Sequence, residues 1–415
     1  MPIVGQIFVG MSLYLTYDEA LDRIAKLARS VRIETIPVAS AHNRVLAVDA
    51  VATINTPPFP RSMMDGFAIR AEHAVPGTSL EIVGMIAAGD KAANTLQAGQ
   101  AVRIMTGGRM PEMADSVARY EWCEEAEGFV TLLRSVTKGE SVQQVGDDAA
   151  KGEVLVAAGT RLTGTHLAAC KCFGIESVQV RCSPAVSIIV TGSELVEEVT
   201  TPLQTGQIYG VNDVFIRHAV ELDGYRVIDV QYVGDSKESI RVAILEASYY
   251  SDYVLVTGGV SVGDLDYVPQ VLHGLGAELA VRKIYIRPGS PFVAASLNDA
   301  VIFGLSGNPA ACYIQFETLV RPVLLRSLGI DEIPFASSGR LAHDIELKPI
   351  KPERIFRARA WIESGAVQVD ARSAQSPGVM SSLSSSNCLI RLDKPDYTQG
   401  SIIQLRWLSA PHTPT

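Results

Sequence analysis

Four continuous apolar segments between residues 183 and 330 constrain the fold more than any other feature of the chain. They cover residues 185–190, 226–233, 253–256 and 300–303. Helical segments separate them, near residues 211–222, 236–248 and 309–326. Apolar strands that alternate with helices are typical of a parallel sheet covered on both faces. The sequence therefore predicts a parallel α/β domain in this region.

The rest of the chain has a different pattern, and 415 residues are too many for one ordinary core. Residues 15–30 repeat apolar positions at helical spacing, with Thr16 as the expected N-cap. Residues 60–150 combine many glycines with short β-type runs, which favours a β-rich insertion domain. The end of the chain returns to short alternating strands and predicts a small β-barrel or sandwich.

These changes of pattern give the expected domain boundaries of an α/β multidomain protein. The predicted parts are an α/β core domain (13–32 and 181–332), a small α+β linker domain (33–54 and 152–180), a β-rich domain (55–151) and a C-terminal β-barrel (333–415).

Charge and composition exclude several classes of partner. A net charge of -9 argues against nucleic acid, because nucleic-acid binders normally carry a basic surface. No apolar run approaches the roughly 18 residues of a membrane span. Residues 1–12 lack the basic region of a signal peptide, and the six cysteines have no CxxC spacing. We therefore expect a cytoplasmic protein with reduced thiols, no structural zinc and no membrane association.

Glycine or carboxylate residues follow each of the four predicted strands. The turns cover residues 191–194, 234–236, 257–266 and 304–309. Ligands of open α/β sheets bind at the carboxyl ends of the strands. Glycine lets backbone N–H groups approach an oxyanion there, and the following helix adds its positive N-terminus. One such turn is weak evidence, but four on one sheet edge predict an anion site.

Three of these turns carry a carboxylate: Glu194, Asp235 and Asp266. Carboxylates beside an anion site indicate a bridging hard cation, with Mg²⁺ the first expectation. Asp235 and Asp264 could instead be N-caps of the helices that follow. The cap interpretation is favoured for Asp264, whereas the two interpretations are equally supported for Asp235.

A second group of residues lies in the β-rich region, where residues 57–59 and 62–67 are followed by residues 104–108. Runs of methionine and aromatic residues are usually core. Asp65, which precedes Gly66, could equally belong to an Asx-turn. These residues alone do not predict a function.

Motifs spread over the whole chain resemble those of the molybdopterin molybdenumtransferase (MoeA) family, which includes the E domain of gephyrin. The matching segments are residues 57–68 (PPF…S-x-MDG-[YF]-A), 103–107 (R-I-M-T-G), 146–148 (G-[ED]-D), 191–195 (T-G-x-E-L), 206–212 (G-Q-I-Y…N), 257–267 (T-G-G-V-S-V-G-x-x-D-Y) and 304–309 (G-L-x-G-N-P). The resemblance runs from about Leu15 to Trp407, and the spaced set is far more specific than any one motif.

The resemblance implies an elongated homodimer of four-domain chains. Its MogA-like α/β domain would hold the dithiolene and phosphate of a pterin, and the other domains would complete the site, partly across the dimer. The implied reaction takes adenylylated molybdopterin, releases AMP in a Mg²⁺-dependent step and places molybdate on the dithiolene sulfurs.

The resemblance also implies site residues. Those with a catalytic role would be Asp65, Thr106, Asp148, Glu194, Asp235, Asp266 and Lys283, with Asp235 and Asp266 holding Mg²⁺. Those that bind the pterin or the oxyanion would be Thr191, Gly192, Gly258, Gly259, Ser261, Gly263, Arg287, Ser290, Ser306, Gly307, Asn308, Pro309, Arg357 and Ser376.

The chain departs from the family pattern at four positions. Where the family has K-P-G-K-P, residues 287–291 have arginine first and Ser290 in place of the second lysine, which removes a positive charge. Ser306 replaces a proline, and Ser193 replaces a common aspartate. The retained acids favour a working molybdenum- or tungsten-inserting enzyme. The charge lost at Ser290 favours the alternative, a catalytically impaired paralogue that binds molybdopterin or acts as a scaffold.

Overall fold

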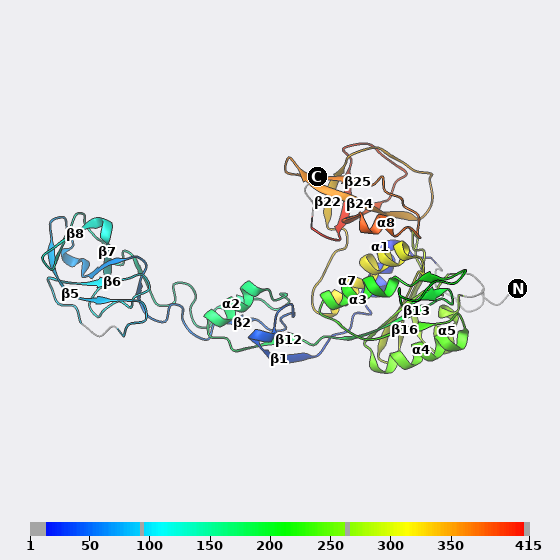
Figure 1. Cartoon of the computed structure of the whole chain (residues 1–415), viewed down its shortest axis with the longest axis horizontal. Helices are drawn as coiled ribbons and strands as arrows, with labels where there is room; N and C mark the ends of the chain where they lie inside the picture. The colour runs from blue at the N-terminus through cyan, green and yellow to red at the C-terminus, as the bar shows by residue number, and fades with distance from the viewer. Residues whose placement is uncertain (1–13, 92–94, 262–265, 411–415) are drawn as a thin grey trace. The chain divides into compact units, whose positions relative to one another are not determined.

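The computed structural model describes residues 14–91, 95–261 and 266–410 (Figure 1). The chain divides into two compact units, Met1–Ile33 with Arg181–Thr415, and Glu34–Val180. The finer division into four domains stays a prediction.

A six-stranded sheet forms the core of the first unit, in the order β16-β13-β17-β21-β20-β18. The strands are β13 (Ala185–Thr191), β16 (Arg226–Val233), β17 (Tyr253–Thr257), β18 (Glu278–Lys283), β20 (Pro291–Leu297) and β21 (Ala300–Leu305). The first four in the sheet order are parallel, which confirms the predicted α/β domain. The sequence pattern did not indicate β18 and β20, which complete the sheet as antiparallel strands.

Helices cover both faces of this sheet (Figure 1). They are α3 (Asn212–Leu222), α4 (Lys237–Tyr250), α5 (Val268–Gly274), α6 (Pro309–Gln315), the π-helical turn η4 (Phe316–Val320) and α7 (Arg321–Ser327). Helices α4 and α5 pack on one face through Ile240, Ile244 and Val271, which join Val254 and Val256 of the central strand in one core. Continuous burial of the central strands explains why they are apolar at every position.

Helix α1 (Tyr17–Ala25) begins where the sequence predicts and ends earlier than expected. Its N-cap is Thr16, whose Oγ1 accepts from the Glu19 N–H (3.3 Å), while Glu19 accepts from the Thr16 N–H (2.9 Å). This reciprocal capping box satisfies two backbone donors at the helix start.

The C-terminal part closes into a five-stranded β-barrel, because β24 pairs with both β25 and β26. The barrel strands are β22 (Ser337–Leu341), β24 (Glu353–Glu363), β25 (Ala366–Asp370), β26 (Cys388–Leu392) and β28 (Ile402–Trp407). The short strand β19 (Ile286–Arg287) leaves the α/β region and pairs in parallel with β24. Smaller elements are β14 (Leu195–Val196), β15 (Ile208–Tyr209), β23 (Ile345–Glu346), β27 (Asp396–Tyr397) and α8 (Ser381–Ser384).

A buried carboxylate joins the barrel to the α/β domain. Glu317, 3% exposed, lies on η4 and accepts from Arg406 of the barrel (2.9 Å) and from Arg321 of α7 (3.1 Å). Arg321 also donates twice to Asp223, at 2.6 and 2.9 Å. The alternation of acids and arginines neutralises charges that burial would otherwise make costly.

The second unit contains a six-stranded sheet in the order β7-β4-β6-β5-β9-β8. Its strands are β4 (Gly66–Ile69), β5 (Ser79–Ile86), β6 (Gln100–Ile104), β7 (Ser116–Arg119), β8 (Cys123–Ala126) and β9 (Phe129–Leu132), which confirms the β-rich character predicted for this region. The unit's other elements are β1 (Ile33–Pro37), η1 (Val38–Ser40), β2 (Ala50–Val51), β3 (Arg61–Ser62), η2 (Ala71–His73), η3 (Tyr120–Trp122), β10 (Val142–Gln143), β11 (Val154–Val156), α2 (Gly164–Cys172) and β12 (Ser177–Arg181).

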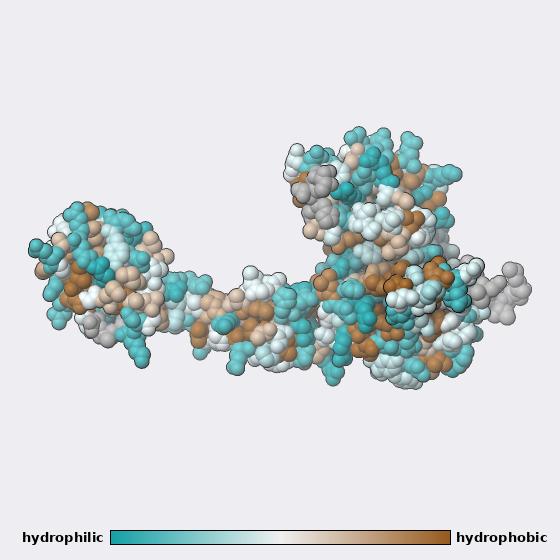
Figure 2. Space-filling model, in the orientation of Figure 1, coloured by the Kyte–Doolittle hydropathy of each residue, from teal (hydrophilic) through white to brown (hydrophobic). Residues whose placement is uncertain are grey.

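The face of the chain drawn in Figure 2 mixes hydrophilic and hydrophobic residues. Such a mixture is ordinary for a folded protein, whose surface is largely apolar by area. Among the described residues, no helix combines the length and the hydropathy needed to cross a membrane.

Replacing Glu317 should strongly destabilise the first unit. Glu317→Ala takes one of two carboxylates from the buried Arg406, which keeps Glu332 (2.9 Å), and one of two from Arg321, which keeps Asp223. Removing a partner from a buried ion pair typically costs about 3–5 kcal/mol, and the remaining carboxylates place the expected cost at the lower end of that range. Denaturant unfolding of the full chain checks this expectation. Glu238→Ala, which breaks the exposed pair with Arg241 on α4, is the control and should leave the unfolding midpoint unchanged. An unchanged midpoint for Glu317→Ala would contradict the proposed docking role.

Candidate functional site

A cavity of about 850 Å³ lies at the carboxyl ends of β13, β17 and β21 and also contacts the barrel. Most of the residues predicted to form the site line it. They are Thr191, Gly192, Glu194, Asp235, Gly258, Gly259, Ser261, Asp266, Arg287, Ser290, Ser306, Gly307, Asn308 and Pro309. The predicted convergence of the turns at one sheet edge is therefore what the structure shows. Gly263 lies outside the described residues.

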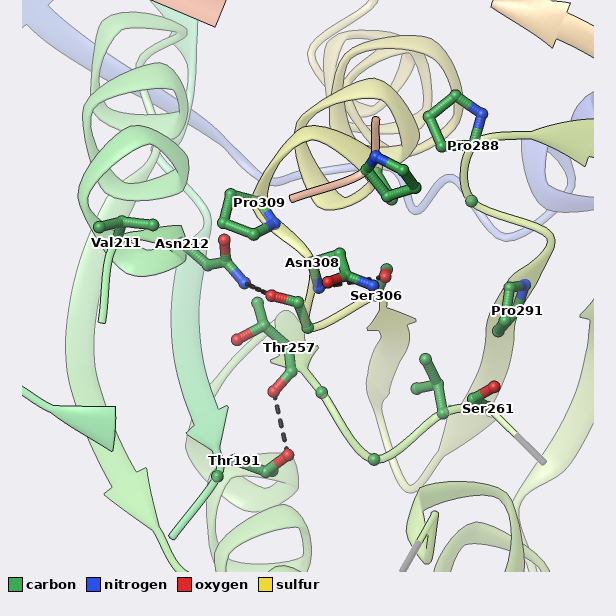
Figure 3. Close-up of a pocket in the computed structure, with 18 of the residues that line it drawn as sticks. Thr191, Val211, Asn212, Thr257, Ser261, Pro288, Pro291, Ser306, Asn308 and Pro309 are labelled. Carbon is green, nitrogen blue, oxygen red and sulfur yellow. Dashed lines mark hydrogen bonds between the residues drawn. The ribbon is translucent and has the colours of Figure 1, made fainter. Parts of the chain in front are cut away.

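Close packing of three turns requires glycine at Gly258. Its φ is +91°, and a Cβ atom there would lie 2.4 Å from Thr191 Oγ1. Thr191 Oγ1 donates to the Thr257 carbonyl oxygen (3.1 Å), and Asn212 Nδ2 donates to the Gly307 carbonyl oxygen (2.9 Å), as Figure 3 shows. Side chains from β13 and α3 thus fix the two glycine-rich turns.

Asp235 is not the cap of helix α4. Ser236 is the N-cap, and its Oγ accepts from the Ser239 N–H (3.0 Å). Asp235 Oδ2 instead accepts from the Ser193 N–H (2.8 Å), and the Asp235 N–H donates to Ser193 Oγ (3.1 Å). The backbone N–H of Ser193 therefore orients the Asp235 carboxylate at the cavity, whereas the serine hydroxyl, one of the departures from the family pattern, accepts from the Asp235 backbone N–H.

The carboxylates of Glu194, Asp235 and Asp266 line this one cavity. Within the described ranges, no three His, Cys, Asp or Glu side chains form a ready-made metal cluster. One or two carboxylates suit Mg²⁺, because this ion usually keeps several waters and completes its coordination with substrate phosphates. The oxygen donors present therefore fit the predicted cation at Asp235 and Asp266.

Gln315, at the end of α6, joins two walls of the cavity. Its Oε1 accepts from the Ser306 N–H (2.7 Å), and its Nε2 donates to the carbonyl oxygens of Gly289 and Pro291 (2.6 Å each). The side chain is completely buried. The N–H that Ser306 donates does not exist in proline, so this departure from the family pattern allows the bond.

The barrel supplies cavity residues that the sequence reasoning missed: Arg354, Phe356, Gln375 and Pro377. Arg354 lies opposite Arg287 in the parallel pairing of β24 with β19. Burial, and secondarily the charge of Arg287, lower the pKa of Arg354. No local sequence signal marks these residues, because barrel strand β24 and the segment after β25, both distant in sequence from the turns, bring them to the site.

Three predicted residues of this unit do not line the cavity. Lys283 ends β18, with its Nζ 5.1 Å from the Tyr14 ring centroid. Arg357 is fully buried and donates to the carbonyl oxygens of Ala374 (2.6 Å) and Ser376 (3.0 Å). Its Nε and Nη1 have no hydrogen-bond partner among the described residues, and burial lowers its pKa. Their predicted roles stay predictions.

In the second unit, Asp65 and Thr106 are joined by two hydrogen bonds. Asp65 Oδ1 accepts from the backbone N–H (2.7 Å) and from Oγ1 (2.9 Å) of Thr106, and these two bonds lower the pKa of Asp65. The Asp65 carboxylate thus bonds to a residue that is distant in sequence. The Asp148 N–H donates to the Thr56 carbonyl oxygen (3.0 Å).

The fold and the cavity define a multidomain α/β protein with a glycine-lined cavity at the edge of its parallel sheet. Residues 15–174 match the MoeA N-terminal region (domain I and II), and residues 187–326 match a probable molybdopterin binding domain. The chain belongs to the molybdopterin molybdenumtransferase (MoeA) family of molybdenum cofactor biosynthesis, as its relatives establish.

The molybdopterin molybdenumtransferase of Bacillus subtilis (strain 168) is 34% identical over 394 residues, which cover 92% of this chain and 90% of that protein. The enzyme of the same name from Staphylococcus aureus (strain MSSA476) is 32% identical, covering 90% of each chain. Among solved structures, a molybdopterin biosynthesis MoeA protein from Pyrococcus horikoshii has a TM-score of 0.82 at 28% identity, covering 96% of this chain and all of that one. The similarity to the family therefore extends over nearly the whole chain.

Removing the Gln315 amide should loosen both cavity loops. Gln315→Met keeps the side-chain length but leaves the Ser306 N–H and two carbonyl oxygens unsatisfied, each at a cost of about 1–3 kcal/mol. Hydrogen exchange should accelerate at the Ser306 amide, and the unfolding midpoint should fall. Thr318→Val is the matched control, because its buried hydroxyl donates to the Ile314 carbonyl oxygen one turn earlier in the same helical segment (2.7 Å). Unchanged exchange at Ser306 in Gln315→Met would show that the amide does not hold the loop.

Proposed function

We propose that this protein inserts molybdenum into the dithiolene of adenylylated molybdopterin and releases AMP in a Mg²⁺-dependent step. The observation that carries the proposal is the single cavity at the sheet edge, which combines glycine-rich turns, three carboxylates and two arginines. A phosphorylated pterin needs backbone donors and positive charge, and a pyrophosphate needs a divalent cation beside it. The names of the relatives support the same reaction class.

In this proposal Asp235 and Asp266 hold Mg²⁺. The bound cation would neutralise the negative charge that develops on the pyrophosphate as AMP leaves. The backbone N–H of Ser193 orients the Asp235 carboxylate (2.8 Å), and the Ser193 hydroxyl accepts from the Asp235 backbone N–H (3.1 Å). Asn212 holds the 304–309 turn through the Gly307 carbonyl oxygen, so that the turn faces the ligand.

We also propose that the protein is a homodimer that acts in the cytoplasm, and that Asp65, Thr106, Asp148 and Lys283 take part in the reaction. These proposals rest on the family resemblance. Light scattering of the full chain should give the mass of a dimer, and a monomeric mass at working concentration would contradict that part of the proposal.

Asp235→Asn and Asp266→Asn should each lower Mg²⁺-dependent AMP release from adenylylated molybdopterin by about 100-fold or more, as expected when a group that orients a catalytic cation is lost. Chelation of Mg²⁺ should stop the wild-type reaction, and added Mg²⁺ should restore it. The assay measures AMP in the presence of molybdate and then of tungstate.

Asp229→Asn is the control for this experiment, because Asp229 lies on β16 but outside the cavity and bonds to Gln231 (2.5 Å). It should release AMP at the wild-type rate. Full AMP release by both cavity variants would remove the catalytic interpretation. A wild-type protein that binds molybdopterin but releases no AMP would favour the impaired paralogue.

A further inference from the structure

Ser290 carries no positive charge, whereas the family motif has a lysine at this position. Its Oγ donates to the Ile284 carbonyl oxygen (2.8 Å), and its own carbonyl oxygen accepts from the Ile284 N–H (3.0 Å). Both bonds stay within residues 284–290 and hold that loop together. The Ser290 hydroxyl therefore already donates its proton to a backbone carbonyl oxygen. Arg287 is the first cation of the motif, and the second cation that the family has at position 290 is missing.

A second cation reaches the same cavity from the barrel. Arg354 lines the cavity together with Arg287 and Ser290. The parallel register of β19 with β24 places Arg287 and Arg354 opposite each other on neighbouring strands. The two guanidinium groups thus come from different domains but belong to one wall.

No carboxylate compensates this pair. Within the described part of the chain, neither Arg287 nor Arg354 forms an ion pair with Asp or Glu. Other arginines at the barrel junction are paired: Arg391 has both Asp18 (2.7 Å) and Glu353 (2.6 Å). Two like charges on neighbouring strands repel each other. Such a pair gains stability when an anion lies between its members.

The Arg354 guanidinium has further N–H donors for such an anion. One of its nitrogens, Nη2, donates to the carbonyl oxygen of Lys348. A guanidinium carries five N–H donors in a planar fork, which matches the oxygens of a tetrahedral anion. The bond to Lys348 therefore orients the side chain without saturating it.

We propose that Arg354 supplies the positive charge missing at Ser290, and that Arg354 and Arg287 together bind a doubly negative tetrahedral oxyanion. This inference rests on the proposed function, in which the oxyanion is either molybdate or the phosphate group of the pterin. In this proposal, one cation of the pocket lies on the barrel strand β24 instead of in the 287–291 loop.

Arg354→Gln tests the role of the charge, because glutamine keeps polar donors without the cation. The molybdate concentration for half-maximal AMP release, or the corresponding pterin concentration, should rise about tenfold with little change in kcat, as expected for one lost charge-assisted contact. A shift with molybdate assigns the pair to the metal oxyanion, and a shift with the pterin assigns it to the phosphate. No shift in either would overturn the proposal.

Rescue provides the sharper test. Ser290→Lys in the Arg354→Gln background should restore most of the lost affinity, because it returns a cation to the family position. A double variant with the same half-maximal concentration as Arg354→Gln would overturn the proposal that Arg354 replaces the missing lysine charge. Arg359→Gln is the matched control, since this arginine is exposed on the same strand and lies outside the cavity.

A binding measurement separates this inference from the proposed function. The thermal midpoints of wild type and Arg354→Gln are compared with sodium molybdate, sodium tungstate and AMP, at constant ionic strength. A wild-type midpoint that rises with one of these anions, and a variant midpoint that does not, supports the arginine pair even if AMP release fails. Equal rises in both proteins, together with equal half-saturating concentrations, would contradict it.

Discussion

The buried carboxylate of Glu317 is the interaction on which the site depends. It accepts from Arg406 of the barrel and Arg321 of the α/β domain, and all three side chains are removed from most solvent. Removing one partner would leave a buried charge, so the network specifies one docking arrangement rather than many. Because the barrel contributes Arg354 and Phe356 to the cavity, the shape of that cavity follows from this docking.

Glu317 lies two residues after Gln315, so one short stretch of chain fixes both the barrel and the loops beside it. Gln315 holds the 287–291 and 304–309 loops through three buried hydrogen bonds. Gly289 makes room for this side chain, since a Cβ there would lie 3.0 Å from Gln315 Cγ. A displacement of the barrel would therefore also shift the loops that face the ligand.

The sequence predicts the features that depend on local pattern. Apolar runs locate β13, β16, β17 and β21, and the carboxyl ends of parallel strands bring their turns together. Long-range registers are not encoded in local pattern, so β18, β20 and the place of Arg354 were missed. Asp235 shows the intermediate case, because the sequence leaves two interpretations open and only the fold places the Ser193 backbone N–H against its carboxylate.

Neighbouring residues in the fold explain the departures from the family pattern. Ser306 provides an N–H that donates to Gln315, and the Ser193 hydroxyl accepts from the Asp235 N–H. A decayed site would lose groups without replacing their partners, since no selection would keep such pairs matched. Here Ser193, Ser290 and Ser306 each take part in a satisfied local network. This pattern favours a pocket that has been rebuilt for turnover over one that has been abandoned.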